Sequence, residues 1–239
     1  MKIDKVTITG ADDNVKHQDL RDIQTEFPFV EWGILFSESK EGTDRYPSKS
    51  WVHDMITYSP KNISAHICGK YMRDILVGDE DIFFNDMFAH AVWESFSRVQ
   101  LNFNVKNSDI NLLEFFHILK TASTHYEIEK FLFQGNHNNK EFIKNVLLPY
   151  SHANKLIGIL FDASGGNGVI GEWQAPYDLP CGYAGGLTPD NLEEELLKIE
   201  GVVGDKTIWI DAETGIRTDN KLDLDKVRKF LTIAKKYTC

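Results

Sequence analysis

Two stretches of the chain, LFDASGGNGVIGEW at residues 160–173 and CGYAGGLTPDN at residues 181–191, decide the fold. Each begins with a short apolar run that leads into a glycine-rich turn, and the first run ends in an acid, Asp162. Glycines let backbone N–H groups approach an anion, and a helix that begins after the turn directs its positive end at it. A third such turn stands at Thr214 and Gly215. Together these turns favour a site for a small phosphorylated ligand over three ordinary tight turns.

Outside these stretches the chain keeps alternating between short apolar runs and amphipathic segments. The apolar runs are rich in β-branched and aromatic residues, which predicts strands at residues 5–9, 29–36, 62–68, 98–103, 130–134, 156–162, 181–184 and 207–211. Helical spacing of apolar residues predicts helices at about 15–25 and 48–58, in a long region up to 96, from 109, up to 150, at 189–199 and at 224–236.

Strands that alternate with helices indicate a parallel sheet. Eight strand–helix units in 239 residues predict an α/β fold in one domain, residues 1–239, built as a single closed (β/α)8 TIM barrel. The main alternative is an open doubly wound sheet. The glycine fingerprint of a dinucleotide site is missing after the first strand, which reads TITGADDN.

Small polar residues and glycines indicate where the helices begin and break. Asp12, Asp13 and Asn14 are expected to cap the first helix, and Ser48 the second. Gly78 is expected to break the long helical region. A short helix with Trp173 is expected after the sixth strand.

Composition excludes several classes of function. The formal net charge is −10 and no run of Lys or Arg occurs, so no nucleic-acid partner is expected. Three cysteines without CxxC spacing and eight scattered histidines argue against a disulfide framework and against a metal site. No apolar run approaches the roughly 18 residues of a membrane span, and the polar start of the chain is unlike a signal peptide. We therefore expect a cytoplasmic protein that does not bind membranes.

A closed barrel binds its ligands at the C-terminal ends of the strands, and the loops after strands seven and eight often hold a phosphate. Gly185 and Gly186 stand in the first of these loops, and Thr214 and Gly215 in the second. These four residues are therefore expected to bind the phosphate of a small phosphorylated sugar or related anion.

The sequence also resembles the phosphoribosylanthranilate isomerases, which are barrel enzymes of tryptophan biosynthesis. The similar segments occur in matching order over nearly the whole chain and are GILFSESKEGTDRYPS, RVQLNF, FDASGGNGVIGEW, AGGLTPDN and IDAETGI. The resemblance implies an Amadori rearrangement that uses no cofactor. In that reaction a general acid opens an aminoaldose phosphate, and a general base then removes the C2 proton to give an aminoketose.

Positions shared with the family imply roles for individual residues. Asp162 matches the general acid, Arg45 an anion contact near the substrate, and Asp211 the acid of strand eight, which is expected to bind the substrate. The phosphate-binding backbone of the family corresponds to Gly185, Gly186 and Gly215.

Other positions depart from the family. The family's base is a cysteine in a Lys-x-Cys-Gly pattern at the end of strand one, whereas this chain has Thr9 for the cysteine and Thr7 for the lysine. Asn102 stands in place of a histidine of strand four, in the substrate site. The Ser-Ser-Gly of strand eight becomes Glu213-Thr214-Gly215, which puts a carboxylate beside the phosphate. Arg217 is expected to compensate for that carboxylate.

A threonine hydroxyl such as that of Thr9 is a very weak base at neutral pH without a partner. Asp12 and Asp13, directly after the first strand, are alternative bases, although helix capping would also explain them. Cys68 shares a strand face with His66 and is a further candidate, although a buried inert thiol beside a packed histidine is the simpler interpretation.

Three hypotheses about function remain. The first and favoured one is a divergent isomerase or lyase that acts on a small sugar phosphate with a changed base or substrate. The second is a non-catalytic barrel that kept the phosphate site, and the third is an authentic phosphoribosylanthranilate isomerase with a relocated base. In each case we expect a monomer or homodimer.

Overall fold

Eight parallel strands form a closed barrel in the computed structural model, which describes residues 1–57, 62–80, 90–103, 105, 110–153, 155–162 and 168–238. The strands follow chain order around the ring: β1(Lys2–Thr9), β2(Val30–Phe36), β3(Ile63–Ile67), β4(Arg98–Leu101), β5(Lys130–Gly135), β6(Ile157–Asp162), β7(Cys181–Ala184) and β8(Thr207–Ala212). β1 pairs with both β2 and β8, which closes the sheet. The barrel prediction is confirmed, and every predicted strand agrees with an observed one to within three residues at each end.

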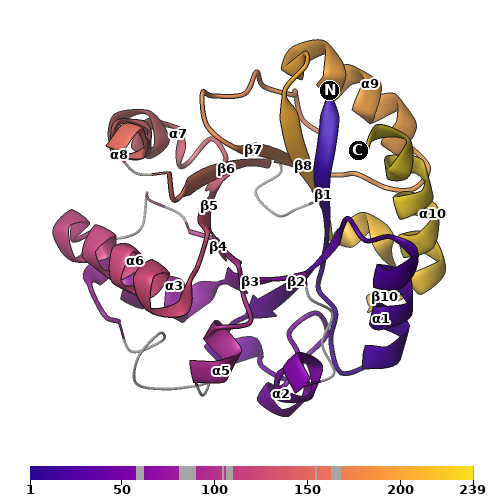
Figure 1. Ribbon diagram of the computed structural model, residues 1–239, viewed down its shortest axis with the longest axis horizontal. Coiled ribbons are helices and arrows are strands. Elements are labelled where there is room, and N and C mark those ends of the chain that lie inside the picture. The colour runs from indigo at the N-terminus through magenta and orange to yellow at the C-terminus, as the bar shows by residue number, and fades with distance from the viewer. Residues whose placement is uncertain are drawn as a thin grey trace.

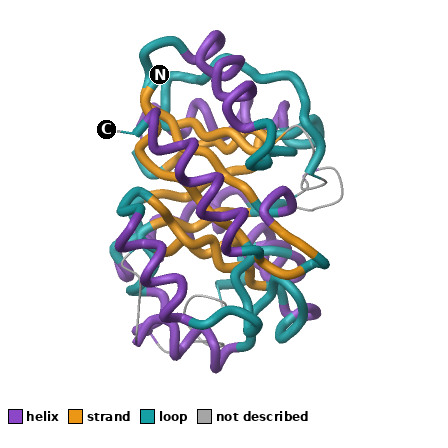
Figure 2. Tube along the Cα trace, turned by 90° about the vertical axis from the view of Figure 1, so that its right-hand side faces the viewer, coloured by secondary structure: helices purple, strands orange, loops and turns teal. Residues whose placement is uncertain are grey.

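Helices surround the barrel, as Figure 1 shows along its axis and Figure 2 from the side. Their bounds are α1(His17–Glu26), α2(Lys49–Thr57), α3(Gly69–Val77), α5(His90–Trp93), α6(Leu112–Tyr126), α7(Lys140–Phe142), the π-helical η3(Ile143–Leu147), α8(Leu148–Ala153), α9(Leu192–Val203) and α10(Leu224–Ala234). Three 3-10 turns, η1(Glu38–Lys40), η4(Thr214–Ile216) and η5(Lys235–Tyr237), and an antiparallel hairpin, β9(Arg217–Thr218) and β10(Lys221–Leu222), complete the described elements.

The expected caps of the first helix were wrong, although its start, predicted at about residue 15, lies within two residues of the observed His17. The N-cap of α1 is Lys16, and its side chain makes no capping hydrogen bond. Asp12 accepts instead from the backbone N of Asn14 (3.0 Å), and Asp13 accepts from Ser48 N (2.8 Å). Both carboxylates therefore organise the loops around α1 and α2 and leave the α1 terminus uncapped.

The other helix boundaries followed the sequence more closely. Ser48 Oγ accepts from Trp51 N, as expected of a cap, and Gly78 ends α3 in the left-handed conformation with a φ of 99°. Residue 109 lies outside the described residues, and α6 begins at Leu112 after the cap Asn111. No helix forms over residues 168–180, so the short helix expected around Trp173 was wrong. The Trp173 indole instead anchors an irregular segment by donating to Glu195 Oε2 of α9 (2.8 Å).

The large apolar core lies between the strands and the helices, because alternate strand residues point outward from the barrel. Inside the barrel a small separate cluster contains Leu132, Leu160, Ala184 and Trp209. The remaining interior positions are largely polar.

A buried ion-pair network occupies the N-terminal end of the barrel interior. Glu31 is fully buried and lies 3.2 Å from Arg98 Nη2 and 3.7 Å from Lys5 Nζ, and it accepts a hydrogen bond from Thr7 Oγ1 (2.9 Å). Burial alone would raise the pKa of Glu31, but the charges of Arg98 and Lys5 outweigh it and lower the pKa. The Arg98 guanidinium also lies 4.7 Å from the centre of the Trp209 ring. This end of the barrel is therefore filled and charge-paired.

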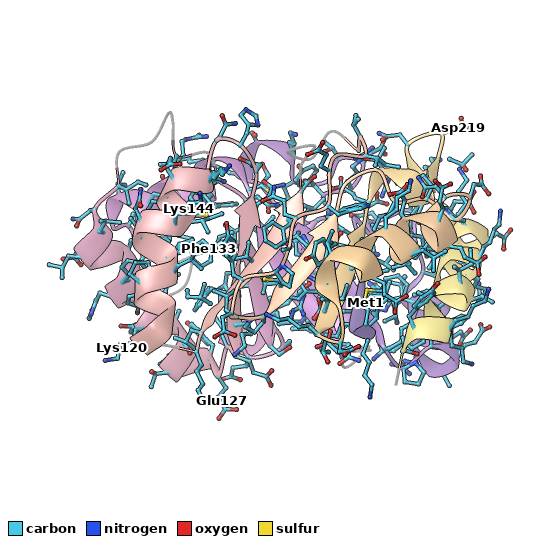
Figure 3. All side chains as sticks on the ribbon, turned by 90° about the horizontal axis from the view of Figure 1, so that it is seen from above. Met1, Lys120, Glu127, Phe133, Lys144 and Asp219 are labelled. Carbon is cyan, nitrogen blue, oxygen red and sulfur yellow. The ribbon has the colours of Figure 1, made fainter. Side chains whose placement is uncertain are left out.

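The opposite end of the barrel carries the loops that follow the strands. In Figure 3, Asp219 of the β9–β10 turn lies at the upper edge and Glu127, just before β5, at the lower edge. The C-terminal ends of the strands therefore face upward in that view. Within the described ranges no helix is both long and apolar enough to cross a bilayer.

Candidate active site

A cavity lies among the C-terminal ends of the strands. Its lining consists of Thr9, His66, Gln100, Asn102, Gln134, Leu160, Asp162, Gly168, residues 184–187 and residues 211–215. Thr9 and Asp162 are the last residues of β1 and β6, and Asp211 is the last but one of β8. Convergence of strand ends on one point thus brings together residues that are far apart in the sequence.

Most residues predicted for the site do line this cavity. They are Thr9, Asn102, Asp162, Gly185, Gly186, Asp211, Thr214 and Gly215. Three others, Asp12, Arg45 and Cys68, lie outside its lining.

Asp211 and Thr9 form a buried pair in the wall of the cavity. Thr9 Oγ1 donates a hydrogen bond to Asp211 Oδ1 (3.0 Å), and both side chains are almost inaccessible to solvent. Burial raises the pKa of Asp211 well above its ordinary value, and the hydrogen bond from Thr9 only partly opposes this. The negative charges of Glu213, Asp162 and Glu31 raise it further. A carboxyl group raised in this way is suited to proton transfer near neutral pH.

Asp162 faces the same cavity from β6. Gln134 Nε2 donates to Asp162 Oδ2 (2.7 Å), and the orientation of the Gln134 amide is supported by a long contact of 3.5 Å from Asn136 Nδ2 to Gln134 Oε1. Gln134 was not predicted for the site. The available signal was a polar residue near the end of an otherwise apolar strand, next to the strand that carries Asp162.

His66 is a second cavity residue that was not assigned to the site by sequence. It is fully buried, its Nε2 lies 3.1 Å from Ser64 Oγ, and its Nδ1 has no hydrogen-bond partner among the described residues. Burial lowers the pKa of His66 to about 4, which keeps the ring neutral. A methyl group on Gly33 would lie 2.5 Å from Thr9 Oγ1 and 2.9 Å from His66 Nε2. Only a glycine at this position of β2 leaves room for both side chains.

The loops after β7 and β8 touch each other at the mouth of the barrel. Gly185 and Gly186 have φ angles of 104° and 69°, which favour glycine. A methyl group on Gly215 would lie 2.1 Å from Leu187 O, so the two backbones approach more closely than any side chain would allow. Asn191 Nδ2 donates to Gly186 O (2.9 Å) and so ties the first loop to the start of α9. The two turns predicted to bind a phosphate therefore lie side by side at the mouth of the barrel.

Residues 168–170, before the irregular segment of Trp173, lie against these two turns. A methyl group on Gly168 would lie 3.1 Å from Thr214 Cβ, and one on Gly186 would lie 2.5 Å from Ile170 N. Residues 163–167, which include two glycines of the predicted turn, lie outside the described residues.

Arg45 compensates for the extra carboxylate at the β8 loop, and Arg217 does not pair with it as expected. Arg45 Nη1 lies 2.7 Å from Glu213 Oε1 and 3.3 Å from Thr214 Oγ1. Arg217 is directed elsewhere, donating to Gly10 O (2.7 Å) and to Asp12 Oδ2 (3.2 Å). The ion-pair partner of Glu213 is therefore Arg45, from the segment between β2 and α2, while burial lowers the pKa of Arg217 and the charge of Glu213 still acts on Arg217 to raise it.

Asp12 supports the backbone that presents Arg45. Its Oδ2 accepts from Arg45 N (2.7 Å), and Arg45 has a φ of 76°, a conformation that side chains rarely adopt without support. Burial would raise the pKa of Asp12, but hydrogen bonds from Arg45 and Asn14 and the charge of Arg217 outweigh it and lower the pKa. Asp12 therefore stays ionised and fully engaged.

Cys68 directly follows β3, two residues after His66. Asn102 Nδ2 donates to Cys68 Sγ (3.3 Å), and Gln100 Nε2 donates to Asn102 Oδ1 (2.9 Å). Burial raises the pKa of the Cys68 thiol to about 11, which leaves it protonated at neutral pH. Among the described residues no group of three His, Cys, Asp or Glu side chains could hold a metal ion.

Comparison with known proteins finds several relatives that are named phosphoribosylanthranilate isomerases. An N-(5'-phosphoribosyl)anthranilate isomerase from Wickerhamomyces anomalus is 35% identical over 218 residues, which cover 83% of this chain and 87% of that protein. The chain belongs to the phosphoribosylanthranilate isomerase family. The model of that family matches residues 124–233.

Two further comparisons agree with this family assignment. A phosphoribosylanthranilate isomerase from Zygosaccharomyces bailii is 41% identical over 85 residues, and that match covers 32% of this chain but only 38% of the relative's length. The solved structure of the isomerase from Pyrococcus furiosus superimposes with a TM-score of 0.59 over 97% of this chain and 98% of that one. At 15% identity the structural likeness shows the shared barrel fold alone.

Proposed function

We propose that this protein catalyses the Amadori isomerisation of a phosphorylated aminoaldose to the aminoketose, with N-(5'-phosphoribosyl)anthranilate as the substrate to test first. The observation that carries the proposal is the meeting of two buried carboxyl groups, Asp162 and Asp211, with the glycine loops of β7 and β8 in one cavity. Proton transfer at two points and an anchored phosphate are what this reaction requires.

Asp162 is the proposed general acid. It donates a proton to the ring oxygen of the sugar, the C1–O bond breaks, and the nitrogen lone pair forms the C1=N bond of an iminium ion. Gln134, hydrogen-bonded to Asp162 Oδ2, holds the carboxyl in place. The substrate phosphate binds at the backbone around Gly186 and Gly215, next to Arg45.

A relative from Schizosaccharomyces pombe, 35% identical over 74 residues, is named as a multifunctional tryptophan biosynthesis protein, and we extend that role to this chain. We place the protein in the cytoplasm, as a monomer or homodimer that needs no cofactor. Its ligand is a small phosphorylated sugar, and the formal charge of −10 is unsuited to nucleic acid.

The test is a fluorescence assay in which phosphoribosylanthranilate is generated enzymatically and its loss is followed. Wild-type protein should turn it over, and Asp162→Asn should reduce kcat by about 10²–10⁴-fold, the range for loss of a general acid. Absence of turnover by the wild type would contradict the proposal.

A non-catalytic sugar-phosphate-binding barrel is the second candidate. It is favoured by Thr9, which stands at the position of the family's base, and by the pairing of Arg45 with Glu213. It predicts that inorganic phosphate or ribose 5-phosphate raises the melting temperature while no isomerisation occurs. Asp162→Asn would then leave ligand binding largely unchanged.

A further inference from the structure

We propose that Asp211 is the base that removes the C2 proton, with Thr9 as the residue that positions it. This inference rests on the isomerase activity proposed above and names the group that replaces a thiolate base. It assigns to the β8 carboxylate a proton-transfer role, where sequence position implied only a contact with the substrate.

The first argument is location. Thr9, at the end of β1, stands where the resemblance places the family's base, and its hydroxyl is hydrogen-bonded to Asp211 Oδ1 (3.0 Å). The carboxyl therefore lies within one hydrogen bond of the position from which the C2 proton would be taken. β1 and β8 are neighbours in the closed barrel, with Thr7 opposite Asp211 in the register, so this proximity is built into the sheet.

The second argument is the state of the other candidate bases. Asp12 is engaged by Arg45 N and Arg217 and does not line the cavity. The thiol of Cys68 also lies outside the lining, and burial raises its pKa to about 11. The hydroxyl of Thr9 is directed at Asp211. Among these groups Asp211 alone is a carboxyl that lines the cavity at the β1 side.

The third argument concerns timing. Burial and the neighbouring carboxylates favour the protonated form of Asp211. The iminium ion formed in the first step brings a positive charge next to it, and an opposite charge nearby favours the ionised carboxylate. Asp211 would therefore release its own proton to solvent as the intermediate forms, and the carboxylate that remains would act as the base.

The two carboxyl groups, Asp162 and Asp211, donate and accept the protons that the isomerisation moves. The carboxylate of Asp211 forms an O–H bond as the C2–H bond breaks, the C2 electron pair forms the C1=C2 bond, and the electrons of C1=N return to nitrogen. The resulting enolamine takes a proton at C1 from Asp211 and gives its O2 proton to the carboxylate of Asp162, which yields the ketone and returns Asp162 to its protonated form and Asp211 to its ionised form. Thr9 holds Oδ1, and no hydrogen bond from the described residues reaches Oδ2, to which we assign the transfer.

The experiment compares wild type, Asp211→Asn and Thr9→Val with phosphoribosylanthranilate carrying either hydrogen or deuterium at C2. Asp211→Asn should lower kcat by about 10²–10⁴-fold, as expected for loss of a general base, while ribose 5-phosphate still raises its melting temperature. Thr9→Val should lower kcat less and move the acidic limb of the kcat–pH profile to higher pH, because the Thr9 hydrogen bond lowers the pKa of Asp211. A merely structural threonine would leave that limb in place.

A thiol supplied at position 9 gives a further check. The double variant with Thr9→Cys and Asp211→Asn should have a kcat at least about tenfold higher than Asp211→Asn alone, since a thiolate at the end of β1 could act as the base. Its acidic limb should then follow the ionisation of the thiol.

Two results would overturn the inference while leaving the isomerase activity standing. One is an Asp211→Asn variant with kcat within threefold of the wild type. The other is a His66→Asn variant that no longer removes the C2 proton while Asp211→Asn still does, which would assign the base to the buried imidazole. No turnover by the wild type overturns the proposed function and this inference with it.

Discussion

Replacing Gly215 with alanine tests whether the close approach of the β7 and β8 loops makes the phosphate site. A methyl group there would lie 2.1 Å from Leu187 O and 2.8 Å from Thr188 Cγ2. Nonbonded heavy atoms settle at about 3.5 Å, so the two loops would have to separate by about 1 Å or more. Overpacking of this kind costs about 1–3 kcal/mol of folding free energy.

Gly215→Ala should also weaken ligand binding, in addition to its cost in folding free energy. Backbone donors moved by about 1 Å lose a well-formed hydrogen bond to a charged group, worth roughly 1.5–3 kcal/mol. We expect Gly215→Ala to weaken binding of ribose 5-phosphate by about tenfold or more, because about 1.4 kcal/mol corresponds to a factor of ten. Calorimetric titration gives the affinity, and urea unfolding gives the stability.

The matched control is Gly201→Ala in α9, where an added methyl group meets no atom within 4 Å. Alanine is the better helix former, so this variant should be more stable than the wild type by about 0.5–1 kcal/mol and bind the ligand equally well. If Gly215→Ala behaved like this control in both measurements, the close contact of the two loops would have no part in the site.

Three further results follow from the charged side chains inside the barrel and at its mouth. Glu213→Gln should tighten binding of a sugar phosphate by roughly threefold to tenfold, because it removes a carboxylate and frees Arg45; titration at low and high salt would show whether the gain is electrostatic. Asp211→Asn should increase the free energy of unfolding above neutral pH, since a raised carboxyl pKa means that wild-type stability falls as pH rises from about 4 through the folded-state pKa; urea unfolding at pH 5 and pH 8 would contradict this if the difference between variant and wild type did not grow with pH. Glu31→Gln should cost about 3–5 kcal/mol, because it leaves the buried Arg98 without its counter-charge, and an unchanged urea midpoint would refute that estimate.

The cavity shows which parts of the site can be predicted from a sequence. Thr9, Asp162 and Asp211 were recognisable because each ends an apolar run, and a parallel barrel places such ends on one face. The glycines were recognisable because the backbone of their turns tolerates no side chain, and Gly186 and Gly215 do make close approaches. Gln134 was missed, although it bonds to Asp162, since a polar residue inside a strand has no pattern of its own.

Pairings between distant side chains could not be predicted in the same way. The sequence offers both Arg217 and Arg45 as counter-charges for Glu213. The path of the loop after β2 decides that Arg45 forms the ion pair. Asp12 looks like a helix cap next to a strand, yet it binds the backbone of Arg45, which lies 33 residues away. His66 and Thr9 share the space above Gly33, a relation between three strands that no local window contains.

The sequence by itself determined the order and length of the strands and helices, and hence the closed barrel, because hydrophobic periodicity and glycine turns act over a few residues. It also predicted eight residues that line the cavity at the C-terminal ends of the strands. Only the tertiary structure decided that the hydroxyl of Thr9 turns to Asp211, that Asp12 and Cys68 are held outside the cavity, and that burial raises the pKa of one carboxyl above its usual range. Those properties depend on which charges and how much solvent surround a group, and closure of the barrel sets both.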